Sequence, residues 1–189
     1  MKHTSLIRLV VAGLVLSSCQ SDSYKIKGYA RQLKDGDTIT LVLEDPPRKV
    51  LGQTLVTDGH FAFSGTTDTT LFCRAYLNRE PLTATSFFLE PGAITIELHR
   101  YPIPSRVSGT LLNNEWQMLN DTVQKLGNRL IRLAEQSTHQ QVTNREQLHH
   151  TIDSLHRQLS AVIKATGHRN RANPLGQYIE HNYKDPEFK

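Results

Sequence analysis

The chain has 189 residues, of which 38% are hydrophobic and 21% are charged, and its formal net charge is +4 at pH 7. Two basic residues, Lys2 and Arg8, belong to an N-terminal segment of signal-like composition, and removal of that segment lowers the net charge to +2. The remaining basic residues do not gather with aromatic ones, so the composition argues against nucleic-acid binding. About 170 residues remain, enough for one ordinary domain or two small ones.

The N-terminal segment combines a basic start with a short apolar run. Residues Leu9 to Leu16 are apolar or small, and the run ends at Ser17-Ser18-Cys19. This order is typical of an export signal, and the run is too short to cross a bilayer as a helix of the mature protein. Two small residues before a cysteine resemble the lipobox of bacterial lipoproteins, which implies cleavage before Cys19 and its acylation. The alternative is an ordinary secretory signal in which a cysteine follows two serines.

Acylation of Cys19 determines both the expected location and the redox chemistry. We expect a signal peptide at 1–18, a lipidated tether at 19–23, and a membrane anchor that faces the periplasm, because several acyl chains hold a domain stably on a bilayer. Gln20 after the cysteine resembles sorting to the outer membrane. Only Cys73 then remains free, so no intramolecular disulfide is possible.

Short strands separated by turns are expected from residue 24 to residue 110. Apolar residues alternate in these runs, and Asp35-Gly36, Asp58-Gly59 and Glu90-Pro91-Gly92 supply turn signals between them. The runs are 38–43, 61–63, 71–77, 87–89 and 94–98, with a last short strand at Val107. In the first run, Ile39, Leu41 and Leu43 are expected to form the single buried face. About seven strands at this spacing predict an antiparallel β-sandwich or barrel-like module.

Helical periodicity replaces this alternation in residues 111–189. Apolar residues recur three and four positions apart in two series. The first series is Trp116, Leu119, Val123, Leu126, Leu130 and Leu133, and the second is Leu148, Ile152, Leu155, Leu159 and Val162. A polar loop at 136–142 separates them, which predicts an antiparallel helical hairpin. The expected fold class is therefore α+β, with a short third helix after Asn173-Pro174 that ends near Tyr183.

Capping residues define the expected ends of the two long helices. Asn113 or Asn114 is predicted to cap the first helix, with Glu115 favourably placed near its N-terminus. Thr143 with Glu146 has the spacing of a capping box for the second helix. Gly167 is predicted to end that helix.

Several sequence segments of the β half carry a family resemblance. They are Ile26-Lys27-Gly28, Asp58-Gly59-His60-Phe61-Ala62-Phe63-Ser64-Gly65, Phe87-Phe88-Leu89-Glu90-Pro91-Gly92 and Val107-Ser108-Gly109-Thr110. Together they resemble a domain of unknown function in lipoproteins of certain Gram-negative bacteria. In that family a helical linker and a thioredoxin-like domain of the peroxiredoxin (AhpC/TSA) or disulfide-reductase type commonly follow. The resemblance implies that the helices here are that linker, although this chain reaches Lys189 without a W-C-x-x-C sequence.

Few residues suggest chemistry. Cys73 alternates with Leu71 and Ala75, so we expect a buried and inert thiol. His149, Asp153 and His156 share one helix face and are weak candidates for a metal site. The paired carboxylates lie at strand ends, and no nucleophile motif is present, so we predict no catalytic residue and no cofactor.

The sequence therefore predicts a membrane-tethered, non-catalytic interaction or accessory module. Its partners are the membrane, through the lipid on Cys19, and a protein or a second copy that contacts the helical hairpin. The alternative is the N-terminal part of a thiol–disulfide oxidoreductase whose thioredoxin-like domain is missing from this chain. A third possibility is that the β module carries a small ligand, but no cluster of polar residues in the sequence suggests a binding site for one.

Overall fold

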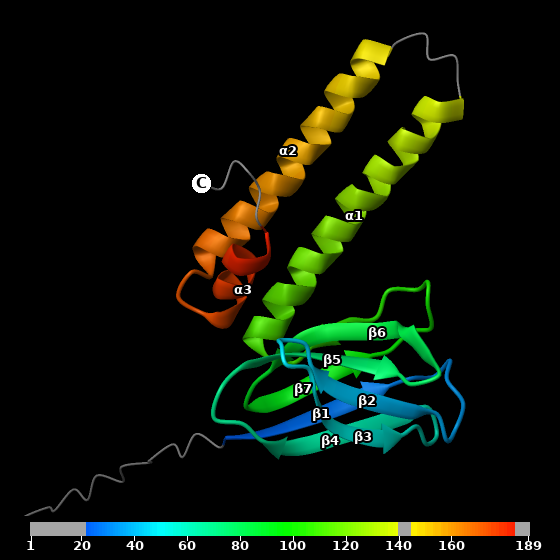
Figure 1. The fold of residues 1–189 in the computed structure, drawn as a ribbon, viewed down its shortest axis with the longest axis vertical. Helices are drawn as coiled ribbons and strands as arrows, with labels where there is room; N and C mark the ends of the chain where they lie inside the picture. The colour runs from blue at the N-terminus through cyan, green and yellow to red at the C-terminus, as the bar shows by residue number, and fades with distance from the viewer. Residues whose placement is uncertain (1–21, 140–144, 184–189) are drawn as a thin grey trace, which may run out of the picture.

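Eight strands and three helices make up the described part of a computed structural model, which covers residues 22–139 and 145–183 (Figure 1). The strands are β1 (Ser23–Tyr29), β2 (Thr38–Leu43), β3 (Lys49–Leu55), β4 (His60–Thr66), β5 (Leu71–Leu77), β6 (Glu80–Leu89), β7 (Gly92–Glu97) and β8 (Arg106–Ser108). The helices are α1 (Leu111–His139), α2 (Arg145–Arg169) and α3 (Pro174–Asn182). The predicted order of a β half followed by a helical half is confirmed.

The strands form two separate four-stranded sheets. One sheet has the order β4-β1-β7-β8 and the other β3-β2-β5-β6. All neighbouring strands are antiparallel except β1 and β7, which run parallel. The α+β sandwich that the sequence predicts is therefore confirmed, with one parallel pair that the local pattern does not reveal.

The core lies between the two sheets and is closely covered. Its fully buried large side chains in the strands are Ile26, Ile39, Leu41, Leu77, Phe87, Phe88, Leu89, Ile94 and Ile96. The prediction of a single buried face on β2 is wrong, because Thr40 and Val42 are buried as well. Gln53 donates a hydrogen bond to the Thr40 hydroxyl, which itself donates to the Asn78 side chain. These neighbours cover the outer face of the strand.

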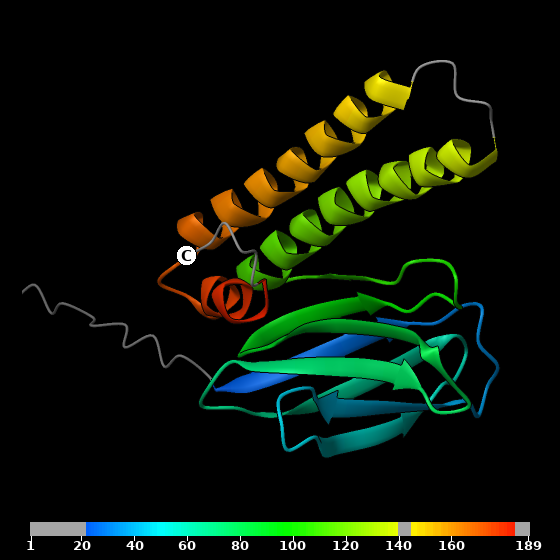
Figure 2. The same cartoon turned by 45° about the horizontal axis from the view of Figure 1, so that its top comes forward.

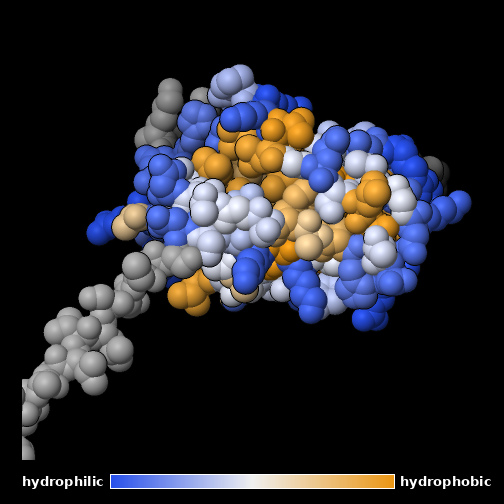
Figure 3. Space-filling model, turned by 90° about the horizontal axis from the view of Figure 1, so that it is seen from below, coloured by the Kyte–Doolittle hydropathy of each residue, from blue (hydrophilic) through white to orange (hydrophobic). Residues whose placement is uncertain are grey.

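The two open sides of the sandwich differ in their cover. At one side the edge strands β6 and β8 lie under the first turns of α1. At the other side the edge strands are β3 and β4, and Val50 and Leu55 of β3 are each 57% exposed. Figure 3, viewed from that side, shows hydrophobic surface bordered by hydrophilic residues. The sequence analysis did not identify β3, whose edge position requires no regular apolar alternation.

The hairpin of α1 and α2 extends beyond the sandwich, and α3 lies at its base (Figures 1 and 2). Its antiparallel arrangement is confirmed, but the loop predicted at 136–142 is helical as far as His139. The rest of that loop and the predicted cap Thr143 lie outside the described residues. In the regions described by the structure, no helix has the length and apolar character needed to cross a membrane.

Candidate interaction surface

Four aromatic rings meet where the helices join the sandwich. Phe72 of β5 and Phe88 of β6 are register partners, with ring centroids 5.2 Å apart. Trp116 of α1 lies edge-on to both rings, and the Tyr178 ring of α3 lies 4.2 Å from the Phe72 ring. The Trp116 indole N–H donates to the Ser86 carbonyl at 2.7 Å. α1 and α3 are therefore packed against the same part of the sandwich.

Asn113 supplies partners for the free backbone of the edge strand β6. Its side-chain oxygen accepts the Phe88 N–H at 2.9 Å, and its side-chain nitrogen donates to the Phe88 carbonyl at 2.8 Å. The prediction that Asn113 or Asn114 caps the helix is wrong, because α1 begins at Leu111. Thr110 precedes it and accepts the Asn114 N–H at 2.9 Å through its carbonyl oxygen. Buried edge groups need such partners, and Asn113 provides two.

Gly109 allows the chain to pass from β8 into α1. Its φ is +111°, and a Cβ at this position would lie 2.2 Å from the Ala93 carbonyl oxygen. A side chain is therefore excluded both by backbone conformation and by space. This requirement gives a physical reason for the glycine in Val107-Ser108-Gly109-Thr110.

An ion pair joins β8 to α1 beside this turn. The Arg106 guanidinium donates to the two Asp121 carboxylate oxygens at 2.7 and 3.1 Å. Gln117 accepts the Val107 N–H at 2.8 Å and donates to Asp121 at 2.8 Å. Burial alone would raise the pKa of Asp121, but the hydrogen bonds and the Arg106 charge lower it. These side chains border a cavity of about 250 Å³.

The returning helix α2 closes the base from the other side. Arg169 lies 3.5 Å from Glu115 of α1, and the Asn170 amide donates to the same carboxylate at 3.1 Å. The prediction that Gly167 ends α2 is wrong, since the helix continues to Arg169. A Cβ at Gly167 would lie 3.1 Å from Ile179, so this glycine permits close packing of α3. The predicted start of α3 is confirmed, with Asn173 as its N-cap.

Away from this base, the hairpin covers the apolar side chains of α1 incompletely, although Leu155 of α2 is only 1% exposed. Among the described side chains of α1 after Leu119, none is fully buried, and the predicted series continues through half-buried Val123, Leu126, Leu130 and Leu133. Ile131 is 59% exposed and lies one turn from Gly127, whose Cβ position has open space around it. A second face of α1 is thus available beside the one that contacts α2.

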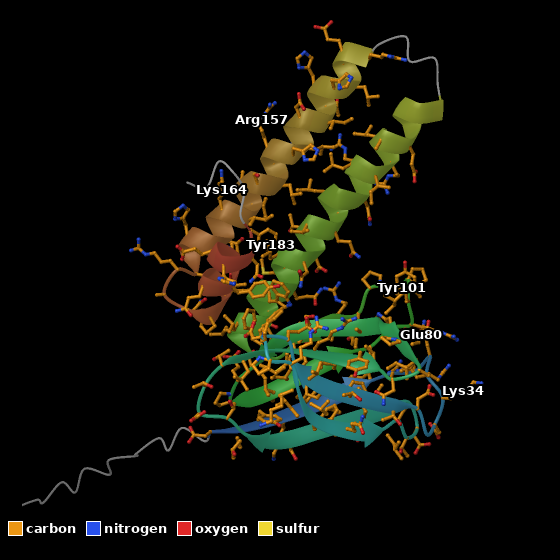
Figure 4. The ribbon with its side chains drawn as sticks, viewed as in Figure 1. Lys34, Glu80, Tyr101, Arg157, Lys164 and Tyr183 are labelled. Atoms are coloured by element: carbon orange, nitrogen blue, oxygen red, sulfur yellow. The ribbon has the colours of Figure 1, made fainter. Side chains whose placement is uncertain are left out.

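A polar groove of about 440 Å³ lies along the same outer half of the hairpin. Arg129 borders it from α1, and Glu146, His150, Ser154 and Gln158 are among its residues from α2. Arg157 and Lys164 lie on the side of α2 turned away from α1 (Figure 4). The outer half of the hairpin therefore combines mixed polar groups with partly exposed apolar ones.

A comparison with family models identifies the β half and the start of α1. Residues 24–116 match a domain of unknown function, DUF4369. The resemblance to such a domain is thereby confirmed. The matched DUF4369 region includes Gly109, Asn113 and Trp116, so it contains the turn and side chains that fix α1 to the sandwich. No curated protein matches the chain.

The DUF4369 region contains Cys73, which is buried as predicted. Burial raises the pKa of its thiol to about 12, and the nearby Asp45 and Glu44 charges act in the same direction. The thiol is therefore protonated at neutral pH and is a poor nucleophile. Cys19, the predicted lipidation site, lies outside the described residues.

The candidate metal ligands are all on the helical hairpin. His149, Asp153 and His156 are exposed on α2. Over residues 22–139 and 145–183, no three His, Cys, Asp or Glu side chains form a group able to hold a metal ion. The structure thus does not bring these three together as a ligand set. What the sequence analysis missed is the polar junction, since Asn113 gives no local signal that it will pair with a strand.

Proposed function

We propose that the protein is a lipid-anchored, non-catalytic module of the bacterial envelope. Acyl chains on Cys19 would hold it at the periplasmic face of the outer membrane, the sandwich would form its body, and the hairpin would be its docking element. The observation that carries the docking role is the incomplete cover of the outer half of α1 next to a firmly packed base. The export signal and lipobox-like residues support the anchor.

We assign the docking face to the outer half of α1 and its occupant to a second copy of the chain. Ile131 and Gly127 lie on a face beside the half-buried Leu126 and Leu130, so a second hairpin could cover both sets at once. A two-fold axis would make this face self-complementary. Pairing of two hairpins would give a four-helix arrangement, a common way to bury such series.

The anchor is tested by comparing the full chain with its Cys19→Ser variant in a Gram-negative host. We expect palmitate incorporation and partition into the detergent phase for the unmodified chain, and loss of both in the variant. Cys73→Ser is the matched control and should retain both properties. Palmitate incorporation that survives Cys19→Ser would contradict the proposal.

The docking role is tested by crosslinking in intact envelopes. Ile131→Cys and Met118→Cys place one exposed thiol each on α1, at its outer half and near its base. A bismaleimide should produce a species of twice the mass from the first variant and much less from the second. Equal yields would count against the outer face, and a crosslink to a different protein would replace the second copy as its occupant.

A second proposal rests on the resemblance to oxidoreductase lipoproteins. Here the chain is the targeting or regulatory part of a thiol–disulfide oxidoreductase, and a thioredoxin-like domain supplies the reactive thiols. The buried, protonated Cys73 favours an external source of such thiols. Genomic sequence that continues after Lys189 into a C-x-x-C frame would support this proposal, whereas unrelated sequence would favour the first.

A further inference from the structure

An exposed leucine marks one end of the sandwich. Leu111, the first residue of α1, is 86% exposed. Side chains on a helix tilt toward its N-terminus, so this one extends toward the base of the hairpin and not along it. Neighbouring Ala93 and Gly92 are also exposed and add no charge.

The sandwich is connected to Cys19 at this same end, where β1 begins. Tyr24, near the start of β1, is the register partner of Gly92 in the parallel pair with β7. A Cβ on Gly92 would lie 3.4 Å from the Thr110 methyl group, and Leu111 is the next residue. Figures 1 and 2 both show the start of β1 and the base of the hairpin at the same end of the sandwich.

The length of the tether limits how far this end can lie from a bilayer. Ser23 follows Cys19 by four positions, and four residue steps span at most about 14 Å. If Cys19 carries acyl chains, as in the proposed function on which this step rests, the start of β1 stays within that reach of the membrane surface. The outer half of the hairpin points away from this end (Figure 1).

We infer that this end of the sandwich lies against the bilayer and that Leu111 enters its interfacial region. The residues shown beside Leu111 at this end, Gly92, Ala93 and Thr110, carry no charge. The apolar side chain, and not a net charge, therefore makes the contact, and a neutral phospholipid surface is sufficient. The hairpin is consequently presented to the periplasm.

The test uses the full acylated chain, purified and reconstituted into phosphatidylcholine vesicles. Leu111→Cys and Leu82→Cys are each labelled with an environment-sensitive fluorophore, since Cys73 is buried and Cys19 is blocked. Leu82 is a matched control because it is 67% exposed and follows Glu80, which lies at the opposite end of the sandwich (Figure 4). Lipids carrying a quencher in the acyl region should quench the probe at position 111 several-fold more than the probe at position 82.

The outcomes separate this inference from the proposed function. Mass spectrometry first establishes whether Cys19 is acylated, and its absence would overturn the anchor itself. Equal quenching at both positions on acylated protein would overturn only the membrane contact of Leu111. Quenching at position 111 that is unchanged by a Cys19→Ser substitution would also overturn it, because the contact depends on the tether.

Discussion

The sandwich and the outer hairpin use similar side chains in opposite ways. Leu41 and Leu77 of the sandwich are almost completely buried, whereas Leu126 and Leu130 of the hairpin remain half-buried although they belong to a regular helical series. Two sheets enclose a leucine from all directions, whereas two helices leave the leucines of α1 partly uncovered, although Leu155 of α2 is only 1% exposed. The comparison teaches that regular periodicity predicts which side chains face one another but not whether they are shielded from water.

Trp116→Ala breaks the link between these regions and should have the largest effect. It removes ring contacts with Phe72, Phe88 and Tyr178 and the hydrogen bond to Ser86. We expect a loss of about 4 kcal/mol in the free energy of unfolding, measured by urea denaturation. Trp116→Phe should lose less. If the substitution changed only the unfolding signal of the helices and not that of the sandwich, it would contradict a junction that both regions share.

Truncation of one leucine in each region tests the comparison directly. Leu41→Ala should lower the free energy of unfolding by about 3 kcal/mol, because it leaves a cavity between two sheets. In the unpaired chain, at low protein concentration, Leu130→Ala should lower it by about 1 kcal/mol, because its site is then open to water. Both are measured by urea denaturation of the same chain. Equal losses would mean that the outer hairpin is covered in solution, as in the proposed pairing of two copies.

Asn113→Ala tests whether the junction is held by polar contacts as well as by rings. The Phe88 N–H and carbonyl would lose their partners in a buried site. We expect a loss of about 2 kcal/mol in the free energy of unfolding. Asn128→Ala, at an exposed position of the same helix, is the control and should change stability little. Similar losses for both variants would show that the helix, and not the contact with β6, is affected.

Asp37→Asn concerns the sandwich alone and should have the smallest effect. Arg79 donates to both Asp37 oxygens at 2.7 and 2.8 Å, and these bonds, with one from the Lys34 N–H, lower the pKa of Asp37 from 3.8 to about 2 against the effect of burial. The charged form is thus favoured by folding, so its stabilisation is complete above pH 3.8 and is lost as the pH falls toward 2.

The measurement is the difference in free energy of unfolding between wild type and Asp37→Asn at several pH values. We expect about 1 kcal/mol near neutral pH, a modest value because Arg79 is partly exposed. This difference should shrink between pH 3.8 and about 2. A difference that stays constant over this range would indicate that the carboxylate charge does not contribute.

Local sequence patterns predicted where the strands and helices lie better than they predicted how the residues of these elements are buried and paired. The alternation around Ile39 and Leu41 identified β2, and the spacing from Trp116 onward identified α1, because both patterns depend on neighbouring residues. The burial of Thr40 depends on Gln53 of β3 and on Asn78 in the turn between β5 and β6. The parallel pairing of β1 with β7 likewise joins residues about seventy positions apart, which no local pattern encodes.

The junction illustrates the same limit at the candidate site. Asparagine is a residue type that commonly caps helices, and the sequence analysis assigned Asn113 that role. Its amide is instead used by the edge of β6, and Thr110 occupies the start of the helix. The residue type was informative about hydrogen bonding, but the partner is supplied by a strand that lies earlier in the chain.

The junction also acts on the hairpin as the pivot of a lever. α1 has 29 residues, which corresponds to a length of about 43 Å at the rise of an α-helix. A turn of about 10° at Trp116 would move the far end of the helix by about 6 Å. Small changes in the packing of four rings therefore become large displacements at the tip, and a rigid pivot gives the outer half of the hairpin a defined position relative to the sandwich.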